Sequence, residues 1–224
     1  MGHLGRTAAA IGTIALSSCA TVQQTTDSTA FQDSFASADY CELSAVRQRS
    51  RSSCGAACLE SLLSYWELDG DQTEILGTEP PGSRAGYSLA ELKGMAKRRG
   101  LTAFKVSFEA SPLDLLHGEL AQGRPVLLAV RCPLGRYFGE PVPLIEHLDT
   151  SVISFSVREE RLAGAPIAST RGRLKDHYVV AFGYEKGAQQ VLLMDPAYGL
   201  VSVGENRLLQ FWGEQNYAAL VCAR

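Results

Sequence analysis

Residues 177–195 carry the pattern that most constrains the fold, because they contain two strand-like runs joined by a short turn. The first run reads HYVVAFGY and the second reads QQVLLMD, so both are dominated by apolar residues. The residues between them, Glu185–Ala188, are mostly polar and include Gly187. Two such runs around a Gly-containing turn predict a β-hairpin, so we expect an antiparallel sheet in this chain.

The register of this hairpin decides which side chains meet. With the turn centred on Lys186, Tyr184 lies opposite Ala188 and His177 lies opposite Asp195. Directly opposed residues of an antiparallel pair project to the same face, so a carboxylate is predicted beside the imidazole. Asp176 should point to the other face, because neighbouring residues of a strand alternate. A one-residue slip or a bulge would break this alignment.

A second feature is the segment QRSRSSCGAACL, in which Cys54 stands where a helix is expected to begin. Ser52 or Ser53 is a suitable N-cap, and apolar residues recur at helical spacing from Leu59 to Trp66. A thiol in the first turn of a helix lies near unpaired backbone N–H groups and the positive end of the helix dipole. Both favour the thiolate, which is the nucleophilic form of cysteine.

The alternatives to a nucleophile at Cys54 are a metal ligand, half of a disulfide and a core residue. A zinc site would need two more ligands beside Cys54 and Cys58, and no second Cys/His pair at metal spacing is present, so no metal or other cofactor is expected. Cys58 is interpreted as a core residue, and Gly55 as a residue that leaves room for a substrate backbone. If Cys54 stays free, the other cysteines of the domain allow three disulfide pairings or remain buried thiols: Cys41, Cys58, Cys132 and Cys222.

Two further histidines are alternatives to His177 as a base. His117 follows Ser111 and Pro112, a pair that predicts the start of a helix, and it is interpreted as a surface or packing residue. His147 lies in a polar segment that is interpreted as a solvated loop. His177 is therefore the favoured base.

The remaining patterns predict an α+β fold in which N-terminal helices pack on an antiparallel sheet. A capping box at Ser88 and Glu91 opens a helix that stops at Gly100. Strands are expected in LTAFKVSF, RPVLLAVR and YAALVCA and near Leu200–Val203, with a short helix around Glu205–Trp212.

The N-terminus has the features of an export signal over residues 1–18. A single cation, Arg6, precedes an apolar stretch and then small residues. Leu16-Ser17-Ser18-Cys19 resembles the lipobox of bacterial lipoproteins, in which the cysteine carries the lipid, and Ala20 then indicates sorting to the outer membrane. We expect a lipid anchor at Cys19 on the periplasmic side of the cell envelope. The alternative is an ordinary signal with a chance cysteine.

Composition limits the organisation and the partners of the rest of the chain. Residues 19–40 are rich in Ser, Thr, Gln and Ala and are interpreted as a flexible tether, followed by one domain over 41–224. A chain of 224 residues that is 46% hydrophobic and 20% charged is typical of a globular protein. The net charge of −3 indicates no nucleic-acid partner, and a monomer is expected.

These residues together resemble the C39 group of papain-like cysteine peptidases, which are bacteriocin-processing or double-glycine peptidases. The family signature is Gln, five residues, then Cys-Gly-x-Ala-x-Leu, and here Gln48 precedes Cys54-Gly-Ala-Ala-Cys-Leu59. Four more stretches follow in family order: GYSLAELKGMAKRRGLTAFKV, GRPVLLAV, DHYVVAFGYE and VLLMDPAYG. The resemblance covers residues 44–131 and 176–200.

The resemblance implies a papain-like fold and a role for each site residue. Cys54 resembles the nucleophile, His177 the general base and Asp195 the acid that orients it. Gln48 resembles the residue whose side-chain amide stabilises the oxyanion. The segment 132–175 is longer than the family connection and is interpreted as an insertion that borders the cleft.

The function implied is a cysteine peptidase that cleaves an exported protein or peptide through a thioester on Cys54. Small residues such as Gly-Gly are expected before the scissile bond. The sequence contains no ATPase domain or multi-span region, so we expect a stand-alone lipoprotein form. Two alternatives remain open, a papain-like acyltransferase or amidase with the same triad, and a non-catalytic peptide-binding module. The intact set of site residues argues against the second.

Overall fold

The computed structural model describes residues 38–133 and 174–224. Within these ranges the helices and strands follow in the order β1 (Asp39–Tyr40), α2 (Cys54–Tyr65), α3 (Gln72–Thr78), α4 (Leu89–Arg98), β2 (Thr102–Ser107), α5 (Pro112–Ala121), β3 (Val126–Pro133), β4 (Leu174–Glu185), β5 (Gln190–Asp195), β6 (Gly199–Gly204), α7 (Glu205–Gly213) and β7 (Ala218–Ala223).

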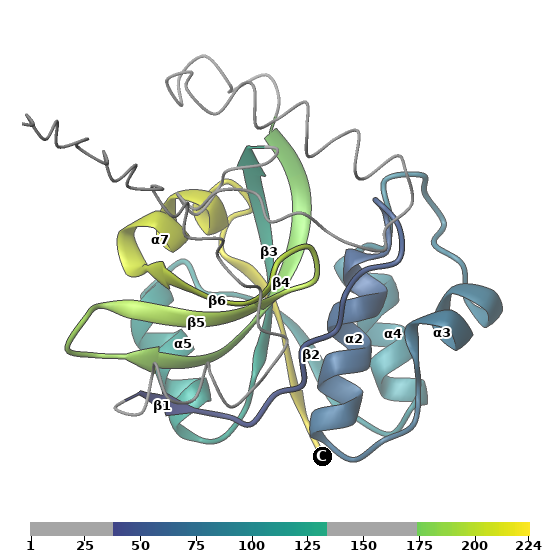
Figure 1. Ribbon diagram of the computed structural model, residues 1–224, viewed down its shortest axis with the longest axis horizontal. Coiled ribbons are helices and arrows are strands. Elements are labelled where there is room, and N and C mark those ends of the chain that lie inside the picture. The colour runs from purple at the N-terminus through teal and green to yellow at the C-terminus, as the bar shows by residue number, and fades with distance from the viewer. Residues whose placement is uncertain (1–37, 134–173) are drawn as a thin grey trace, which may run out of the picture.

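The described strands form one antiparallel sheet. Its order is β2-β7-β3-β4-β5-β6, and β1 pairs with β4 beside this path. Helices α2, α3 and α4 lie on one side of the sheet, and α5 and α7 lie on the other (Figure 1). The predicted α+β class with an antiparallel sheet is therefore confirmed.

Alternate residues of β3 enter two separate cores. Leu127 and Ala129 pack in the core that contains α2 and α4, whereas Leu128 and Val130 pack in the core that contains α5 and α7. Successive side chains of a strand point to opposite faces, so a continuous apolar strand serves both cores. The strand β3 is thus buried on both faces, and it pairs with β4, the strand that carries His177.

Local capping residues explain where two helices begin. Ser88 and Glu91 form the predicted capping box of α4, and Gly100, with a φ of 94°, follows its end. The sequence analysis does not predict α3, although Asp71 caps it by accepting hydrogen bonds from the N–H groups of Thr73 and Glu74 at 2.6 and 2.9 Å. This short helix has too few turns for an apolar period to be recognised.

The strand β1 lies against β4 where β4 changes register. Asp39 and Tyr40, which the sequence analysis assigns to the tether, pair with Tyr184 and Gly183. The register between β4 and β5 shifts between Ala181 and Gly183. A Cβ atom at Gly183 would lie 2.7 Å from the carbonyl oxygen of Asp39 and closer still to the Cβ of Tyr40. Only glycine therefore fits against β1 at this position.

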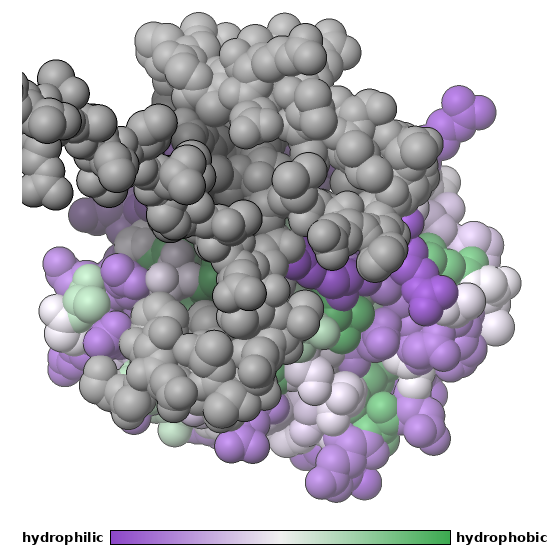
Figure 2. Space-filling view, viewed as in Figure 1, coloured by the Kyte–Doolittle hydropathy of each residue, from purple (hydrophilic) through white to green (hydrophobic). Residues whose placement is uncertain are grey.

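The described surface visible in Figure 2 is mainly hydrophilic, with hydrophobic residues in small separate groups. Among the described helices, none combines the length and the apolar character needed to cross a membrane. The expected signal and lipid site at Cys19, the loop of His147 and most of the expected insertion lie outside the described residues.

Replacing Gly183 should destabilise the protein through the contact of β1 with β4. We expect Gly183→Ala to lower the free energy of unfolding by about 1–3 kcal/mol, because the new methyl group overlaps β1. Urea unfolding followed by circular dichroism measures this change. Gly187→Ala is the matched control, since a Cβ there meets no atom within 4 Å. Equal stability of the two variants would contradict the packing described for Gly183.

Candidate active site

Cys54 is the first residue of α2 and is only 6% exposed. Ser53 is the N-cap residue, one of the two expected, but its side chain does not cap the helix. Its Oγ instead accepts a hydrogen bond from the N–H of Ser50 at 2.9 Å and donates to the Ser50 carbonyl at 3.1 Å. The first-turn N–H groups of α2 thus receive no side-chain cap, and their partial positive charge is left beside Cys54.

The imidazole of His177 contacts both Cys54 and Asp195. Its Nε2 lies 3.0 Å from Oδ1 of Asp195, and its side chain also forms a hydrogen bond with the Cys54 thiol. With Nε2 at the carboxylate, Nδ1 is the ring nitrogen left for the sulfur. His177 is 8% exposed and Asp195 is completely buried. The structure therefore brings together the three side chains proposed from the sequence as a triad.

The turn after β5 holds the Asp195 carboxylate in place. Oδ1 of Asp195 accepts a second hydrogen bond from the N–H of Ala197 at 2.7 Å. The N–H of Tyr198 donates to the Asp195 carbonyl at 3.1 Å, which closes the turn. Because a buried carboxylate must be satisfied by donors, this turn and His177 together account for its position.

The predicted hairpin of β4 and β5 is confirmed, but its predicted register is wrong. Tyr184 pairs with Val191 instead of Ala188, and Val180 pairs with Met194, two residues beyond the predicted partner. The turn begins one residue later than expected, and the irregularity after Ala181 reduces the register error from three residues at Tyr184 to two at Val180. His177 and Asp195 are consequently not directly opposed.

His177 and Asp195 still share a face of the sheet. The predicted register is wrong by two residues near them, and residues two apart on a strand point to the same face. Val179 and Leu193, the next residues in the same alternation, both pack in the core with α5 and α7. A diagonal pair on one face is within reach of long side chains. As predicted, Asp176 points away; it is exposed and accepts a hydrogen bond from Nε of Arg131 at 2.6 Å.

Gln48 belongs to the segment that leads into α2 and contacts the turn that follows Asp195. It is 5% exposed, and its backbone N–H donates to the Pro196 carbonyl at 2.9 Å. Its side-chain Nε2 donates one hydrogen bond, to the Ser50 carbonyl at 2.9 Å, so a second N–H of that amide is left for another acceptor. Its Oε1 accepts no hydrogen bond from the described part of the chain.

Comparison with known proteins identifies the family of this chain. The model of the peptidase C39-like family matches residues 40–222. The chain belongs to the peptidase C39-like family. No curated protein matches the chain in a separate comparison.

Solved structures of C39 domains have the same fold as this C39-like chain. A double-glycine motif protease of an AMS/PCAT transporter, solved with its leader peptide, is 16% identical with a TM-score of 0.52, and the match covers 82% of this chain and 92% of that one. The peptidase domain of Streptococcus ComA, a bifunctional ABC transporter of a quorum-sensing pathway, is 16% identical with a TM-score of 0.51, covering 80% and 96%. A "putative C39-like peptidase" from Bacillus anthracis is 14% identical with a TM-score of 0.53, and the match covers 84% of this chain and 98% of that one.

The electrostatics of this C39-like site favour a charged thiol–imidazole pair. Burial alone would lower the pKa of His177, but the charge and the hydrogen bond of Asp195 raise that pKa to about 10. Burial alone would raise the pKa of Cys54, but the hydrogen bond and positive charge of His177 bring that pKa below its ordinary value. Both pKa shifts therefore act in the direction of a thiolate beside an imidazolium.

The other described cysteines are buried free thiols, which was one of the open alternatives: Cys41, Cys58, Cys132 and Cys222. Burial raises the pKa of Cys58 and of Cys132 well above the ordinary value, and it raises the pKa of Cys222 to about 12. Among the described residues, no group of three or more His, Cys, Asp or Glu side chains is arranged to hold a metal ion. Among the described cysteines of this C39-like domain, Cys54 is thus the one whose pKa is lowered.

The sequence analysis missed Lys175, two residues before His177 on the same strand. Its Nζ donates a hydrogen bond to the Arg51 carbonyl at 2.7 Å, three residues before Cys54, and its charge adds to the lowering of the Cys54 pKa. The two-residue spacing on β4 was the available signal, because residues at this spacing share a face of the strand.

The structure corrects the prediction for Gly55 and supports the one for His117. A Cβ at Gly55 would lie 3.2 Å from a methyl carbon of Leu92 and 3.3 Å from the ring of Tyr178, so this glycine serves the packing of α2. The described surroundings of Gly55 are thus core side chains and not a substrate path. His117 stacks on Tyr184 with ring centroids 4.2 Å apart, which makes it a packing residue.

The pH dependence of thiol alkylation tests the charged pair. We expect iodoacetamide to modify Cys54 first, with a rate that rises as pH passes a thiol pKa below 9.0 and stays level while His177 is cationic, up to about pH 10. In His177→Ala the largest effects that oppose burial are lost, so the pKa of Cys54 rises and alkylation at pH 7 should slow at least about tenfold. Mass spectrometry identifies the modified cysteine, and Cys54→Ala is the control. The same pH midpoint in wild type and His177→Ala would contradict the pair.

Proposed function

We propose that the protein is a cysteine peptidase that cleaves peptide bonds through a thioester on Cys54. The observation that carries this proposal is the buried arrangement in which His177 bonds Cys54 on one side and Asp195 at 3.0 Å on the other. A nucleophile, a base within hydrogen-bonding reach and a third group that orients the base are the elements of covalent acyl transfer. Membership of the C39-like family supports the same chemistry.

In the first half of the proposed reaction, the Cys54 thiolate attacks the carbonyl carbon of the scissile peptide bond. The oxyanion of the tetrahedral intermediate accepts hydrogen bonds from the backbone N–H of Cys54 and from the side-chain amide of Gln48. The His177 imidazolium then donates its proton to the leaving nitrogen, the C–N bond breaks, and an amine product leaves. Asp195 keeps the imidazole oriented and stabilises its positive charge.

In the second half, water hydrolyses the thioester. Neutral His177 takes a proton from the attacking water, and the same oxyanion donors stabilise the second tetrahedral intermediate. The C–S bond breaks, the carboxylic acid product leaves, and the thiolate–imidazolium pair is restored. Each role requires only side chains and backbone groups of this chain and one water molecule.

The proposed substrate is an exported protein or peptide with small residues, such as Gly-Gly, before the cleaved bond. One structure of similar fold is that of a double-glycine motif protease in complex with a leader peptide. The same residues would also serve an acyltransferase or an amidase, because the thioester is common to all three reactions. A peptide-binding module without catalysis would not need the charged pair.

Loss of the thiol should abolish cleavage. We expect Cys54→Ala to lower kcat on fluorogenic peptides with Gly-Gly before the leaving group by at least about 1,000-fold. Cys222→Ala, a change at a buried thiol with no contact to the triad residues among the described interactions, is the matched control and should keep activity.

The product distinguishes the alternatives. Mass spectrometry of the reaction in the presence of an added amine measures how the thioester divides between water and the amine, because a transferase forms mainly the new amide and a peptidase mainly the free acid. Equal cleavage by wild type and Cys54→Ala would remove the peptidase proposal. Peptide binding by both proteins without any turnover would indicate a binding module.

We also propose that the domain is anchored by a lipid on Cys19 to the outer membrane and faces the periplasm. The support is the run Leu16-Ser17-Ser18-Cys19 after an apolar stretch, and the tether-like composition that follows it. A domain held in this way would meet exported substrates.

Removal of Cys19 should release the protein from the membrane. We expect Cys19→Ser to lose incorporation of labelled fatty acid and to move from the membrane fraction to the soluble periplasmic fraction of a bacterial host. Cys41→Ser, a change at the next cysteine along the chain, should stay in the membrane fraction. Membrane association of Cys19→Ser equal to wild type would contradict the anchor.

A further inference from the structure

One buried side chain of helix α3 forms hydrogen bonds with the backbone on both sides of Gln48. Gln72, the first residue of α3, is 2% exposed. Its Nε2 donates a hydrogen bond to the Arg47 carbonyl at 2.8 Å, and its Oε1 accepts one from the Arg49 N–H at 2.8 Å. The amide group of Gln72 therefore satisfies the carbonyl before Gln48 and the N–H after it.

Gln72 is itself fixed to the helix that begins with Cys54. Its backbone N–H donates to Oε2 of Glu60, a residue of α2, at 2.9 Å. Gln72 thus links the segment that contains Gln48 to the body of α2, and through it to Cys54. This link adds to the hydrogen bonds that join Gln48 to Ser50 and Ser50 to the N-cap residue Ser53.

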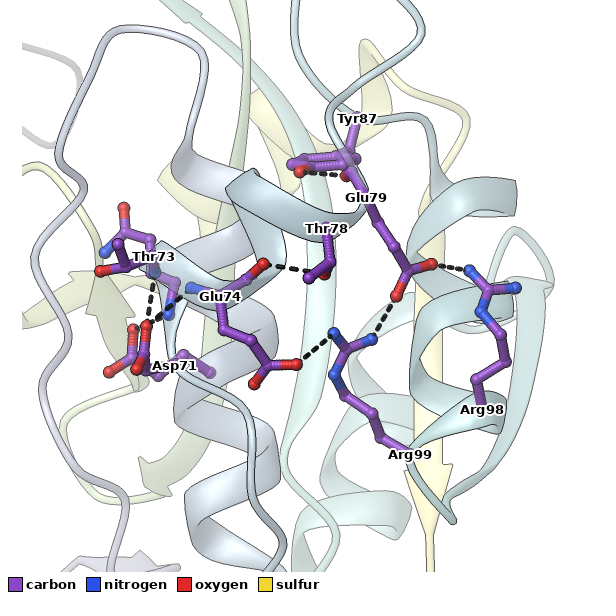
Figure 3. A network of polar contacts seen from close by, with 10 residues as sticks. Asp71, Thr73, Glu74, Thr78, Glu79, Tyr87, Arg98 and Arg99 are labelled. Atoms are coloured by element: carbon purple, nitrogen blue, oxygen red, sulfur yellow. Dashed lines mark hydrogen bonds and ion pairs between the residues drawn. The ribbon is translucent and has the colours of Figure 1, made fainter.

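The helix α3 is held firmly enough to act as a support. Figure 3 shows Asp71 capping its N-terminus and Arg99 of the α4 C-cap reaching two carboxylates of the α3 region. Arg99 contacts Glu79 at 2.6 Å and Glu74 at 3.3 Å, and Arg98 also pairs with Glu79. These ion pairs join the α3 region to the end of α4, so the helix that begins with Gln72 is attached to a second helix.

We propose that Gln72 is a positioning residue for the oxyanion site, a role that rests on the proposed function of Gln48. The two hydrogen bonds of Gln72 fix the orientation of the peptide groups on either side of Gln48. Rotation of either peptide group would turn the Gln48 side chain away from the orientation in which its second amide N–H is proposed to stabilise the oxyanion. Preorganised donors of this kind stabilise the transition state because they need no rearrangement during the reaction.

A purely structural role would show itself differently from a positioning role. Loss of Gln72 leaves a buried carbonyl and a buried N–H without partners, so some loss of stability is expected in either case. A positioning role lowers kcat on peptides but spares a reaction of Cys54 that forms no oxyanion. Alkylation by iodoacetamide is such a reaction, since the thiolate displaces iodide directly at a saturated carbon.

The test compares Gln72→Met, which keeps the size of the side chain and removes both hydrogen bonds, with a matched control. The control is Ser61→Ala, which removes a buried hydrogen bond of 2.6 Å from α2 to the Ser44 carbonyl, in the same segment but away from Gln48. We expect Gln72→Met to lower kcat roughly 10- to 100-fold, with KM and the alkylation rate of Cys54 changed less than about twofold. Ser61→Ala should leave kcat, KM and alkylation near their wild-type values.

A double-mutant cycle with Gln48 identifies the route of the effect. In Gln48→Ala the oxyanion amide is absent, so adding Gln72→Met should lower kcat no further. An undiminished effect of Gln72→Met in that background, or a parallel fall in alkylation, would overturn the positioning role and leave a structural one. Where circular dichroism shows that Gln72→Met does not fold, Gln72→Glu replaces it. That variant keeps the bond from the Arg49 N–H and loses the bond to the Arg47 carbonyl, so its kcat should fall while the alkylation rate of Cys54 stays near the wild-type value.

Failure of the proposed function is recognised separately, as an absence of Cys54-dependent turnover in the wild-type protein. The positioning role is then judged from the side-chain amide resonances of Gln48, assigned by their loss in Gln48→Ala. These resonances should shift or broaden in Gln72→Met and remain in place in Ser61→Ala. Unchanged resonances in Gln72→Met would overturn the proposal whatever the activity of the enzyme.

Discussion

The hydrogen bond between Cys54 and His177 is the interaction on which the candidate site depends, because it joins the start of a helix to a strand of the sheet. Burial by itself would keep both groups neutral. The charge of Asp195 reverses that preference for His177, and the charge of His177 then reverses it for Cys54. Asp195 therefore favours the charged form of His177, and His177 favours the charged form of Cys54. The effect on Cys54 is lost if the helix and the sheet separate.

The loops around this pair act as one unit. The backbone N–H of Gln48 donates to the Pro196 carbonyl, and the Arg47 guanidinium donates to the Ala197 carbonyl. The segment before α2 is thus bonded to the turn that holds Asp195. A helix N-terminus without a side-chain cap is tolerated at Cys54 because its N–H groups lie in a site where a negative charge is expected.

The sequence predicted the face of the key residues better than their register. Strand residues alternate with period two, so the prediction that His177 and Asp195 share a face survived a register error of two residues. The irregularity of β4 before Gly183 could not be predicted locally, because it accompanies the approach of β1. The capping box predicted the start of α4. Asp71 is an N-cap of the same kind, but α3 is too short to add an apolar period that would have identified it as a helix.

The sequence by itself determined the α+β class, the helix that begins at Cys54 and the strands that carry His177 and Asp195, because caps, turns and apolar periods are local properties of the chain. Only the tertiary structure decided which buried polar groups support the site. The bonds of Gln72 to the segment around Gln48 and of Lys175 to the Arg51 carbonyl join residues far apart in the chain. No local period encodes such contacts, since they arise only when packing brings separate elements together and the buried backbone groups must find partners.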